Sequence, residues 1–320
     1  MSGYYLLKNG EFAYNKSYSV GYDFGSVKRL DRYPMGALST LYICFSLTKH
    51  DSDFIKVYFD SLKWYKEIYM IAAEGARNHG LLNVPTDEFF NTQHILPTDT
   101  KEQQKIAAFM LLIEKRIEKQ RQLVEALKSY KRGVLSKLFP QNDETTPQYR
   151  FAGFTEPWKE HKVGDIVDVC SGKDYKHLSE GTIPVYGTGG YMLSVSEALS
   201  YDNDAIGIGR KGTIDKPFIL NAPFWTVDTL FYAVPKEKVD LNFAYAIFQN
   251  IDWKTKDEST GVPSLSKAVI NDIDIFVPDY DEQQTLGLVL SEIDLLITLY
   301  KNKLDESHKV KAGLLQQLFI

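Results

Sequence analysis

The residues with the most recognisable chemical spacing are three glycines, Gly207, Gly209 and Gly212, which follow an apolar, strand-like run. Their spacing is G-x-G-x-x-G, a pattern that binds a dinucleotide pyrophosphate where a helix begins at the glycines. In this sequence Pro217 follows closely and would interrupt such a helix. We therefore expect a β-turn at these glycines and no cofactor site.

The same turn carries two cations, Arg210 and Lys211, followed by Thr213. An arginine can donate two hydrogen bonds to guanine O6 and N7, and a lysine can contact a base or a phosphate. Two interpretations stay open for this turn: a structural hairpin turn, or a contact with DNA.

A second glycine-rich turn runs from Tyr186 to Tyr191 with the sequence Tyr-Gly-Thr-Gly-Gly-Tyr. Glycine lets a backbone approach a phosphate closely, and the flanking tyrosines suit a nucleic-acid surface. The candidate DNA contacts here are Tyr186, Thr188, Gly189, Gly190 and Tyr191, and a structural turn is the alternative.

Composition and motifs argue against several other classes of protein. The 320 residues suggest about two domains, and 44% apolar with 25% charged residues is an ordinary globular balance. Phosphate-loop, zinc-protease and serine-hydrolase motifs are absent from the sequence. No signal peptide or membrane-spanning run is evident, and two distant cysteines, Cys44 and Cys170, suit a reducing cytoplasm. The net charge of −5 argues weakly against a DNA-binding protein that acts alone.

The elements that position these turns follow from an internal repeat. Residues 102–139 and 282–319 align without a gap, and ten of the 38 positions are identical. Apolar residues at alternating steps of three and four, among them Ile106, Phe109 and Ile117, predict two long helices that pack along one seam. Asp99 with Glu102, and Asp279 with Glu282, predict a reciprocal cap at each helix start.

The repeat extends upstream of each helix, so the chain alternates domain, helix, domain, helix. Short β-branched runs predict strands at 11–14, 165–170, 183–186, 205–208 and 229–234, with a short helix at 243–250. The expected class is α+β, with two β-rich domains and two long helices. The predicted divisions are a first domain at 1–100, a helix at 101–139, a linker at 140–150, a second domain at 151–280 and a helix at 281–320.

Several motifs in their order resemble one family, the specificity subunits of type I restriction-modification systems. They are Gly-x-Pro-x-Leu-Ser at 261–266, Val-Pro before Glu-Gln-Gln at 277–284, and Ile-Gly-Arg-Lys-Gly-Thr at 208–213. Trp158, Val163 to Asp165, and Ser171 to Lys173 resemble the start of a target-recognition domain in that family. The resemblance covers essentially the whole chain.

The resemblance implies a non-catalytic protein that reads double-stranded DNA. Each target-recognition domain would read one half of a split site, and the two helices would pair as an antiparallel coiled coil that spaces the domains. Methyltransferase and motor-nuclease subunits would be the partners, and S-adenosylmethionine, ATP and Mg²⁺ would belong to them. The chain itself would then bind no cofactor and no metal, would lie in the cytoplasm and would not associate with a membrane.

One departure from the family pattern concerns the first domain. Residues 1–30 already match the later part of the second domain, near 191–220, so the first domain is expected to lack a counterpart of 151–190. A truncated gene product, a recombined variant and a half-subunit completed by another polypeptide all remain open. An alternative function is a coiled-coil scaffold that binds methyltransferase without reading DNA.

The remaining candidate DNA contacts are basic and polar residues at the predicted domain surfaces. Asn15, Lys16, Ser17 and Tyr18 follow a strand-like run, roughly where Arg210 and Lys211 stand in the second domain. The rest of the set is Lys28, Arg29 and Arg77 in the first domain and Lys173 in the second. For each of them, a solvated loop residue is the alternative interpretation.

Overall fold

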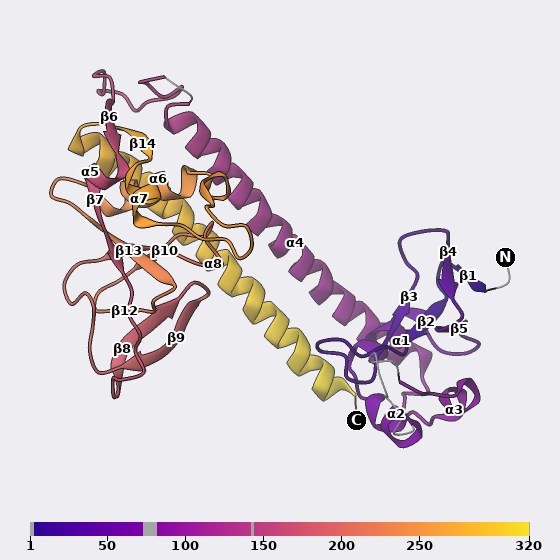
Figure 1. The fold of residues 1–320 in the computed structure, drawn as a ribbon. Coiled ribbons are helices and arrows are strands. Elements are labelled where there is room, and N and C mark those ends of the chain that lie inside the picture. The colour runs from indigo at the N-terminus through magenta and orange to yellow at the C-terminus, as the bar shows by residue number, and fades with distance from the viewer. Residues whose placement is uncertain (1–2, 73–81, 142–143, 320) are drawn as a thin grey trace. The chain divides into compact units, whose positions relative to one another are not determined.

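The structure is a computed structural model that describes residues 3–72, 82–141 and 144–319. Contacts divide the chain into two compact units, Met1–Leu123 with Tyr300–Ile320, and Val124–Leu299. Each unit holds one β-rich domain and part of each long helix. The mixture of helices and sheets confirms the predicted α+β class (Figure 1), while the domain limits drawn from the sequence stay a prediction.

The first unit contains two small antiparallel sheets followed by short helices. Strand β1 pairs with β4, and β2 lies between β3 and β5. The bounds are β1 Tyr4–Lys8, β2 Phe12–Asn15, β3 Ser26–Arg29, β4 Met35–Ser39, β5 Ile43–Phe45, α1 Ser52–Asp60, α2 Tyr65–Ile71 and α3 Thr86–Asn91.

The second unit contains three sheets, ordered β11-β10-β13-β7, β12-β8-β9 and β14-β6. All neighbours are antiparallel except β12 and β8. The strands are β6 Lys159–Lys162, β7 Val167–Ser171, β8 Glu180–Gly187, β9 Gly190–Val195, β10 Ala205–Gly209, β11 Phe218–Leu220, β12 Trp225–Thr226, β13 Leu230–Pro235 and β14 Asp274–Val277. The short helices are α5 Val163–Ile166, α6 Leu241–Asn250, η1 Trp253–Lys256 and α7 Lys267–Asn271.

Most of the predicted short elements are confirmed, and one is partly wrong. The runs at 11–14, 183–186, 205–208 and 229–234 fall largely on β2, β8, β10 and β13, and the short helix is α6. The run predicted as a strand at 165–170 begins instead as the helical turn α5. The Asp165 carboxylate accepts a hydrogen bond from the Lys162 backbone amide at 2.7 Å, which closes that turn before β7 begins.

A buried tryptophan marks the same place in both units. Trp64 donates its indole N–H to the Phe59 carbonyl at 2.9 Å, and Trp253 donates to the Phe248 carbonyl at 2.7 Å. The two tryptophans, like the two phenylalanines, stand 189 residues apart in the sequence. The sequence comparison did not align these residues, so the structure extends the internal repeat into α1 and α6.

The two long helices, α4 Thr100–Leu138 and α8 Tyr280–Leu318, confirm the predicted helix pair. In the first unit, Met110 near the start of α4 shares a core with Leu315 near the end of α8. In the second unit, Leu135 near the end of α4 shares a core with Leu290 near the start of α8. The helices therefore run antiparallel in each unit. Phe109, expected in the seam, is instead 48% exposed.

A seven-residue spacing defines the seam of each helix. In α4 it passes through Met110, Ile117, Val124 and Lys131, all buried. In α8 the equivalent positions, each 180 residues on, are Leu290, Ile297, Leu304 and Lys311. A repeat of seven residues is the period of a coiled coil. A lysine thus occupies the same seam position in both helices.

Each seam lysine pairs with a carboxylate of the other helix. Lys131 Nζ lies 2.5 Å from Asp294 Oδ2 in the second unit, and Lys311 Nζ lies 2.8 Å from Glu114 Oε1 in the first. Glu114 and Asp294 are themselves related by the 180-residue repeat. A polar residue at a seam position fixes the register of a coiled coil, because only one alignment gives it a partner.

A glutamine at the start of each long helix fastens it to its domain. The Gln103 amide donates to the Pro97 carbonyl and accepts from the Asp51 backbone amide. Gln283 makes the same two bonds, to the Pro278 carbonyl and from the Asp240 backbone amide. Asp51 and Asp240 cap α1 and α6. The repeated Glu-Gln-Gln motif therefore joins the helix start to the short helix of its own domain.

The predicted reciprocal caps are confirmed only in part: at the first helix the Asp99 half is present, but no hydrogen bond from the Asp99 amide to Glu102 is seen among the described residues. Asp99 Oδ1 accepts a hydrogen bond from the Lys101 amide at 2.9 Å. Glu282, expected to complete the second cap, instead receives two hydrogen bonds from Arg150, at 2.8 and 2.7 Å. The guanidinium competes for the carboxylate because Glu282 is buried and a buried charge requires a partner.

Among the described residues, no helix is long and apolar enough to cross a membrane.

Candidate nucleic-acid interface

The turn that follows β10 holds Arg210 and Lys211 on a backbone fixed from two sides. Both of their amides donate to the Thr229 carbonyl, at 2.8 and 3.3 Å. On the other side, the Arg210 carbonyl accepts from the Leu265 amide at 2.9 Å, and the Gly212 amide donates to the Pro263 carbonyl at 2.8 Å. The two side chains therefore project from a turn held between β13 and the 263–265 segment.

Two glycines are required by this turn. A Cβ on Gly209 would stand 2.0 Å from the Thr213 carbonyl oxygen, and Gly212 has a φ of +93°. A side chain is excluded at the first position and strained at the second. The glycines of the G-x-G-x-x-G run thus shape a turn, and the residues after Gly212 form no helix before α6. The expected turn is confirmed.

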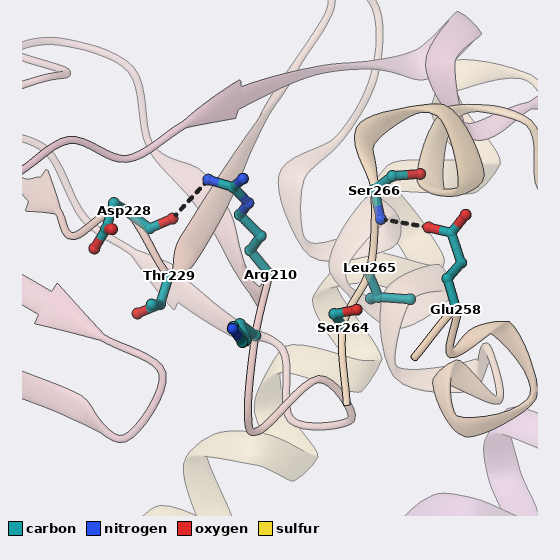
Figure 2. A pocket seen from close by; sticks show the side chains of 8 residues that line it. Arg210, Asp228, Thr229, Glu258, Ser264, Leu265 and Ser266 are labelled. Carbon is teal, nitrogen blue, oxygen red and sulfur yellow. Dashed lines mark hydrogen bonds between the residues drawn. The ribbon is translucent and has the colours of Figure 1, made fainter. Parts of the chain in front are cut away.

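A cavity of about 430 Å³ opens beside this turn. Its lining is Arg210, Lys211, Asp228, Thr229, Glu258, Ser264, Leu265 and Ser266. Figure 2 shows the Arg210 guanidinium turned toward the Asp228 carbonyl, at 3.3 Å, and the Glu258 carboxylate turned toward the Ser266 amide, at 3.0 Å. Among the described residues neither Arg210 nor Lys211 forms an ion pair. The Arg210 guanidinium donates to the Asp228 carbonyl and lies 5.8 Å from the centre of the Phe231 ring, and both cations line the cavity without a carboxylate partner.

The far wall of the cavity belongs to a loop built around Asp257. Its carboxylate accepts from the amides of Ser259 and Ser264, each at 2.9 Å. Those backbone amides lower the pKa of the Asp257 carboxyl, so it stays ionised and holds the loop closed. Sequence reasoning used the Gly-x-Pro-x-Leu-Ser run only as a family motif and missed that this segment lines the cavity.

The second glycine-rich turn is the tip of the hairpin β8–β9. Tyr186 pairs with Tyr191 and Gly187 with Gly190, which leaves Thr188 and Gly189 as the loop. A Cβ on Gly212 would stand 4.0 Å from Thr188 Oγ1, so the hairpin tip lies beside the Arg210 turn. Thr213, one residue further on, is half-buried in that turn. The structure therefore brings the two predicted turns together on one surface.

Tyrosine rings and Lys173 extend this surface. Tyr191 is 63% exposed, and its ring meets that of Tyr186 edge-on at 6.4 Å. Lys173 is exposed, and its carbonyl accepts from the Trp225 indole at 2.9 Å. Trp225 belongs to β12, which pairs with β8. Lys173 is thus anchored to the same small sheet that carries the hairpin.

Lys16 occupies in the first unit the place that Arg210 occupies in the second. The Leu82 amide donates to the Lys16 carbonyl at 2.9 Å, as the Leu265 amide does to Arg210. Asn15 Oδ1 accepts from the Ser17 amide at 3.0 Å and fixes this turn. Tyr18 is 57% exposed beside it. The two turns thus share one backbone hydrogen bond to the segment that precedes α3 or α7, and the roles of Asn15 to Tyr18 stay a prediction.

Lys28 and Arg29 lie on β3, away from this turn. Arg29 pairs with Phe12 at the end of the β2–β3 ribbon opposite to Asn15. Its guanidinium is largely buried and donates to Asp31 and Asp53, each at 2.6 Å. Lys28 lies 2.6 Å from Asp60; burial lowers the pKa of this lysine, but Asp60 outweighs burial and raises it overall. Both cations are therefore engaged within the unit.

Arg77 lies outside the described residues. Within the residues that are described, no group of histidine, cysteine and carboxylate side chains could hold a metal ion.

Comparison with known proteins now defines the class. Residues 155–307, which include the cavity and the hairpin, match the family model of the type I restriction modification DNA specificity domain. This match, over 153 of the 320 residues, agrees with the resemblance found in the motifs and places a type I specificity domain in the second half of the chain.

Individual relatives agree with this assignment. The type I restriction enzyme MjaVIII specificity subunit of Methanocaldococcus jannaschii is 23% identical over 192 residues, which are 51% of this chain and 42% of that protein. The match thus spans less than half of that relative. The S subunit of a type I system from M. genitalium has a TM-score of 0.65 at 20% identity, over 98% of this chain and 84% of that one. A structure reported for complex assembly of the type I R-M system gives 0.60 at 12% identity, over 99% and 83%. These likenesses show the same fold.

Proposed function

We propose that this chain is the DNA-reading subunit of a type I restriction-modification complex. Each β-rich domain reads one half of a split site in double-stranded DNA. The helices α4 and α8 serve as the spacer of the subunit. Methyltransferase and motor-nuclease subunits dock on the chain and supply the chemistry, so S-adenosylmethionine, ATP and Mg²⁺ bind to them. The chain acts in the cytoplasm and catalyses no step itself.

One observation carries the proposal: the specificity domain presents two cations, neither of which forms an ion pair with any described residue, on a turn held by backbone hydrogen bonds from two sides. An arginine held this way donates two parallel hydrogen bonds to guanine with little loss of conformational entropy. Lys211 and Lys173 suit phosphate oxygens, which position a protein on the duplex. The hairpin tip at Thr188 and Gly189 lies beside the turn and offers backbone amides to the same duplex.

The net charge of −5 is compatible with this role. The charge that matters for binding is local, and partner subunits can supply further phosphate contacts. Lys16, in the equivalent turn of the first unit, is the proposed reader of the other half-site.

Arg210→Ala tests the proposal in the assembled methyltransferase complex. If Arg210 reads a base, specific binding falls by about 1–3 kcal/mol while binding to random DNA changes little. Methylome mapping identifies the cognate site, and competition binding with cognate and random duplexes measures the ratio. Lys159→Ala is the matched control, because the Lys159 side chain is 76% exposed on β6 and its one ion pair among the described residues is with Asp279 at 3.9 Å. An unchanged ratio for Arg210→Ala contradicts base reading, and a stable complex without any cognate site favours the scaffold alternative.

A further inference from the structure

The two units repeat each other closely enough to compare them position by position. Trp64 corresponds to Trp253 and Asp51 to Asp240, both at a separation of 189 residues. After the turn, Pro97 corresponds to Pro278 at a separation of 181, because each accepts the glutamine bond of its long helix. These shared contacts fix which residue of the first unit stands for which residue of the second.

In the second unit, one segment covers the outer face of the domain. Strand β6 pairs with β14, the turn α5 packs on α7, and β7 pairs with the outer edge of β13. Val163 and Ile166 of this segment are buried in the main core. The domain edge is therefore completed by the residues from Lys159 to Ser171.

In the first unit, the corresponding face has no such cover among the described residues. Strand β5 corresponds to β13, but its only described neighbour is β2. Residues 93–96 correspond to β14 and form no strand, and Ile95 is 74% exposed. A cavity of about 410 Å³ opens here. Its lining is Phe45, Ser46, Leu47, Thr48, Lys49, His50, Phe59, Phe89, Phe90, Thr92 and His94.

The walls of this cavity are the counterparts of residues that the covering segment contacts in the second unit. Phe45 corresponds to Val234, which pairs with Asp168, and Leu47 corresponds to Lys236, whose amide donates to the Ile166 carbonyl. The match holds along the β5 edge of the cavity.

The residues of the opposite wall are also counterparts of residues that the covering segment contacts in the second unit. Phe90 corresponds to Asn271, against which Gly164 packs so closely that an added Cβ would lie 3.0 Å from the Asn271 Cβ. Thr92 corresponds to Ile273, whose carbonyl accepts the Val163 amide at 2.9 Å. His94 corresponds to Ile275, which pairs with His161. Both walls are thus those that a segment like 161–168 fills.

We propose that this aromatic cavity and the free edge of β5 form a docking groove for a polypeptide segment with the chemistry of residues 161–171. The occupant is a glycine-containing helical turn followed by an apolar β-strand. Its strand adds to β5 by backbone hydrogen bonds, and its valine and isoleucine side chains enter the cavity lined by Phe45, Phe59 and Phe89. Addition of a strand to an exposed edge is an established mode of peptide recognition. This inference concerns the completion of the first unit and does not rest on DNA reading.

A peptide added to the full-length protein tests the groove. The probe is a fluorescent peptide of residues 157–172 with Cys170→Ser, and its binding is followed by anisotropy. We expect saturable binding that Phe90→Glu weakens by about tenfold or more, which corresponds to about 1.4 kcal/mol. Met70→Glu is the matched control, because Met70 is an exposed apolar residue of the same unit, on α2.

Three outcomes overturn the proposal: no saturable binding, equal binding to the Phe90→Glu variant, or equal binding of a peptide carrying Val163→Asp and Ile166→Asp. Equal binding to the Phe90→Glu variant would result if the peptide displaced residues 157–172 from the second unit, to which Phe90 does not belong.

Disulfide trapping tests the register independently of affinity. In the second unit Val169 pairs with Ala233, whose counterpart on β5 is Cys44. Residues opposed across antiparallel strands have Cα atoms about 4.5–5.5 Å apart, within the range of a disulfide. In a Cys170→Ser protein, the same peptide carrying Val169→Cys, added as its mixed disulfide with thionitrobenzoate, should form an adduct on Cys44 by exchange, with release of thionitrobenzoate, much faster than the equally activated peptide carrying Asp165→Cys. Equal rates for the two peptides refute the proposed register.

Discussion

The buried lysine of the helix seam gives the sharpest prediction on stability, through the variant Asp294→Ala. The Lys131 side chain is 7% exposed and lies between Asp294 and Gln249, with the Tyr245 ring 5.5 Å away. Removal of the carboxylate leaves a buried cation with one neutral acceptor and one ring. The free-energy cost of this unpaired buried lysine exceeds the stabilisation that the intact ion pair gave, because no carboxylate offsets the desolvation of the lysine.

The expected loss follows from the exposure of the two partners. Removal of one member of a fully buried ion pair costs about 3–5 kcal/mol. Asp294 is 32% exposed and Gln249 still accepts from Lys131, so the expected cost is lower, about 2–3 kcal/mol. The repeat supplies the control: Glu114→Ala removes the equivalent partner of Lys311, whose side chain is 23% exposed. Lys311 is less buried than Lys131 and keeps a second carboxylate, Asp60 Oδ2 at 4.0 Å, so the expected loss for Glu114→Ala is smaller, about 1 kcal/mol.

The loss should also depend on pH. Burial lowers the pKa of Lys131 below its ordinary value of 10.5, while Asp294 acts to raise it. Without Asp294 the pKa falls further, so between that pKa and 10.5 the unfolded chain binds more protons than the folded one. The free energy of unfolding of the Asp294→Ala variant then increases as pH rises through this range. The difference in free energy of unfolding between the variant and the unchanged protein should therefore shrink.

Urea unfolding at several pH values, with hydrogen exchange followed in residues 241–250 and 280–299, measures both effects. Equal losses for Asp294→Ala and Glu114→Ala would refute the reasoning, as would a deficit that grows with pH.

Two further predictions concern single contacts. Arg150→Ala leaves the 2%-exposed Glu282 carboxylate without its two hydrogen bonds and should lower the free energy of unfolding by about 3 kcal/mol; urea unfolding measures it, and a loss below 1 kcal/mol would mean that water replaces the guanidinium. Gly209→Ala places a methyl group on the Thr213 carbonyl and should displace the Arg210 turn, so that the preference for cognate over random DNA falls while the circular dichroism spectrum is retained; an unchanged preference would show that the turn does not position the reader.

The long helices were predictable because their seam residues repeat every seven positions and are mostly apolar. The lysines of the seam were not, since Lys131 and Lys311 look like surface residues until a carboxylate of the other helix is placed beside them. Similarly, Asp165 was assigned to a strand because its neighbours are β-branched, whereas its carboxylate closes a helical turn.

The candidate site was partly predictable for the same kind of reason. The sequence alone predicted the turn at Arg210, because its glycines and Pro217 exclude a helix. It also predicted the glycine-rich turn at Thr188. Their proximity depends on sheet order, which one sequence does not determine. The sequence did not predict that the loop with Glu258 forms the far wall of the cavity. This loop lies about fifty residues after Arg210, and the backbone hydrogen bonds of Leu265 and Pro263 join its segment to the Arg210 turn.

The seven-residue spacing of the seam limits how this chain can change in length. An insertion of one helical turn in α4 alone would move Lys131 about 5.4 Å along the seam and away from Asp294, whereas an insertion of seven residues in both helices would keep every pair. Seven residues add about 10.5 Å to a helix, close to the rise of three base pairs at about 3.4 Å each. If the helices separate two DNA-reading domains, evolution can alter the gap between half-sites only in coarse steps that change both helices together.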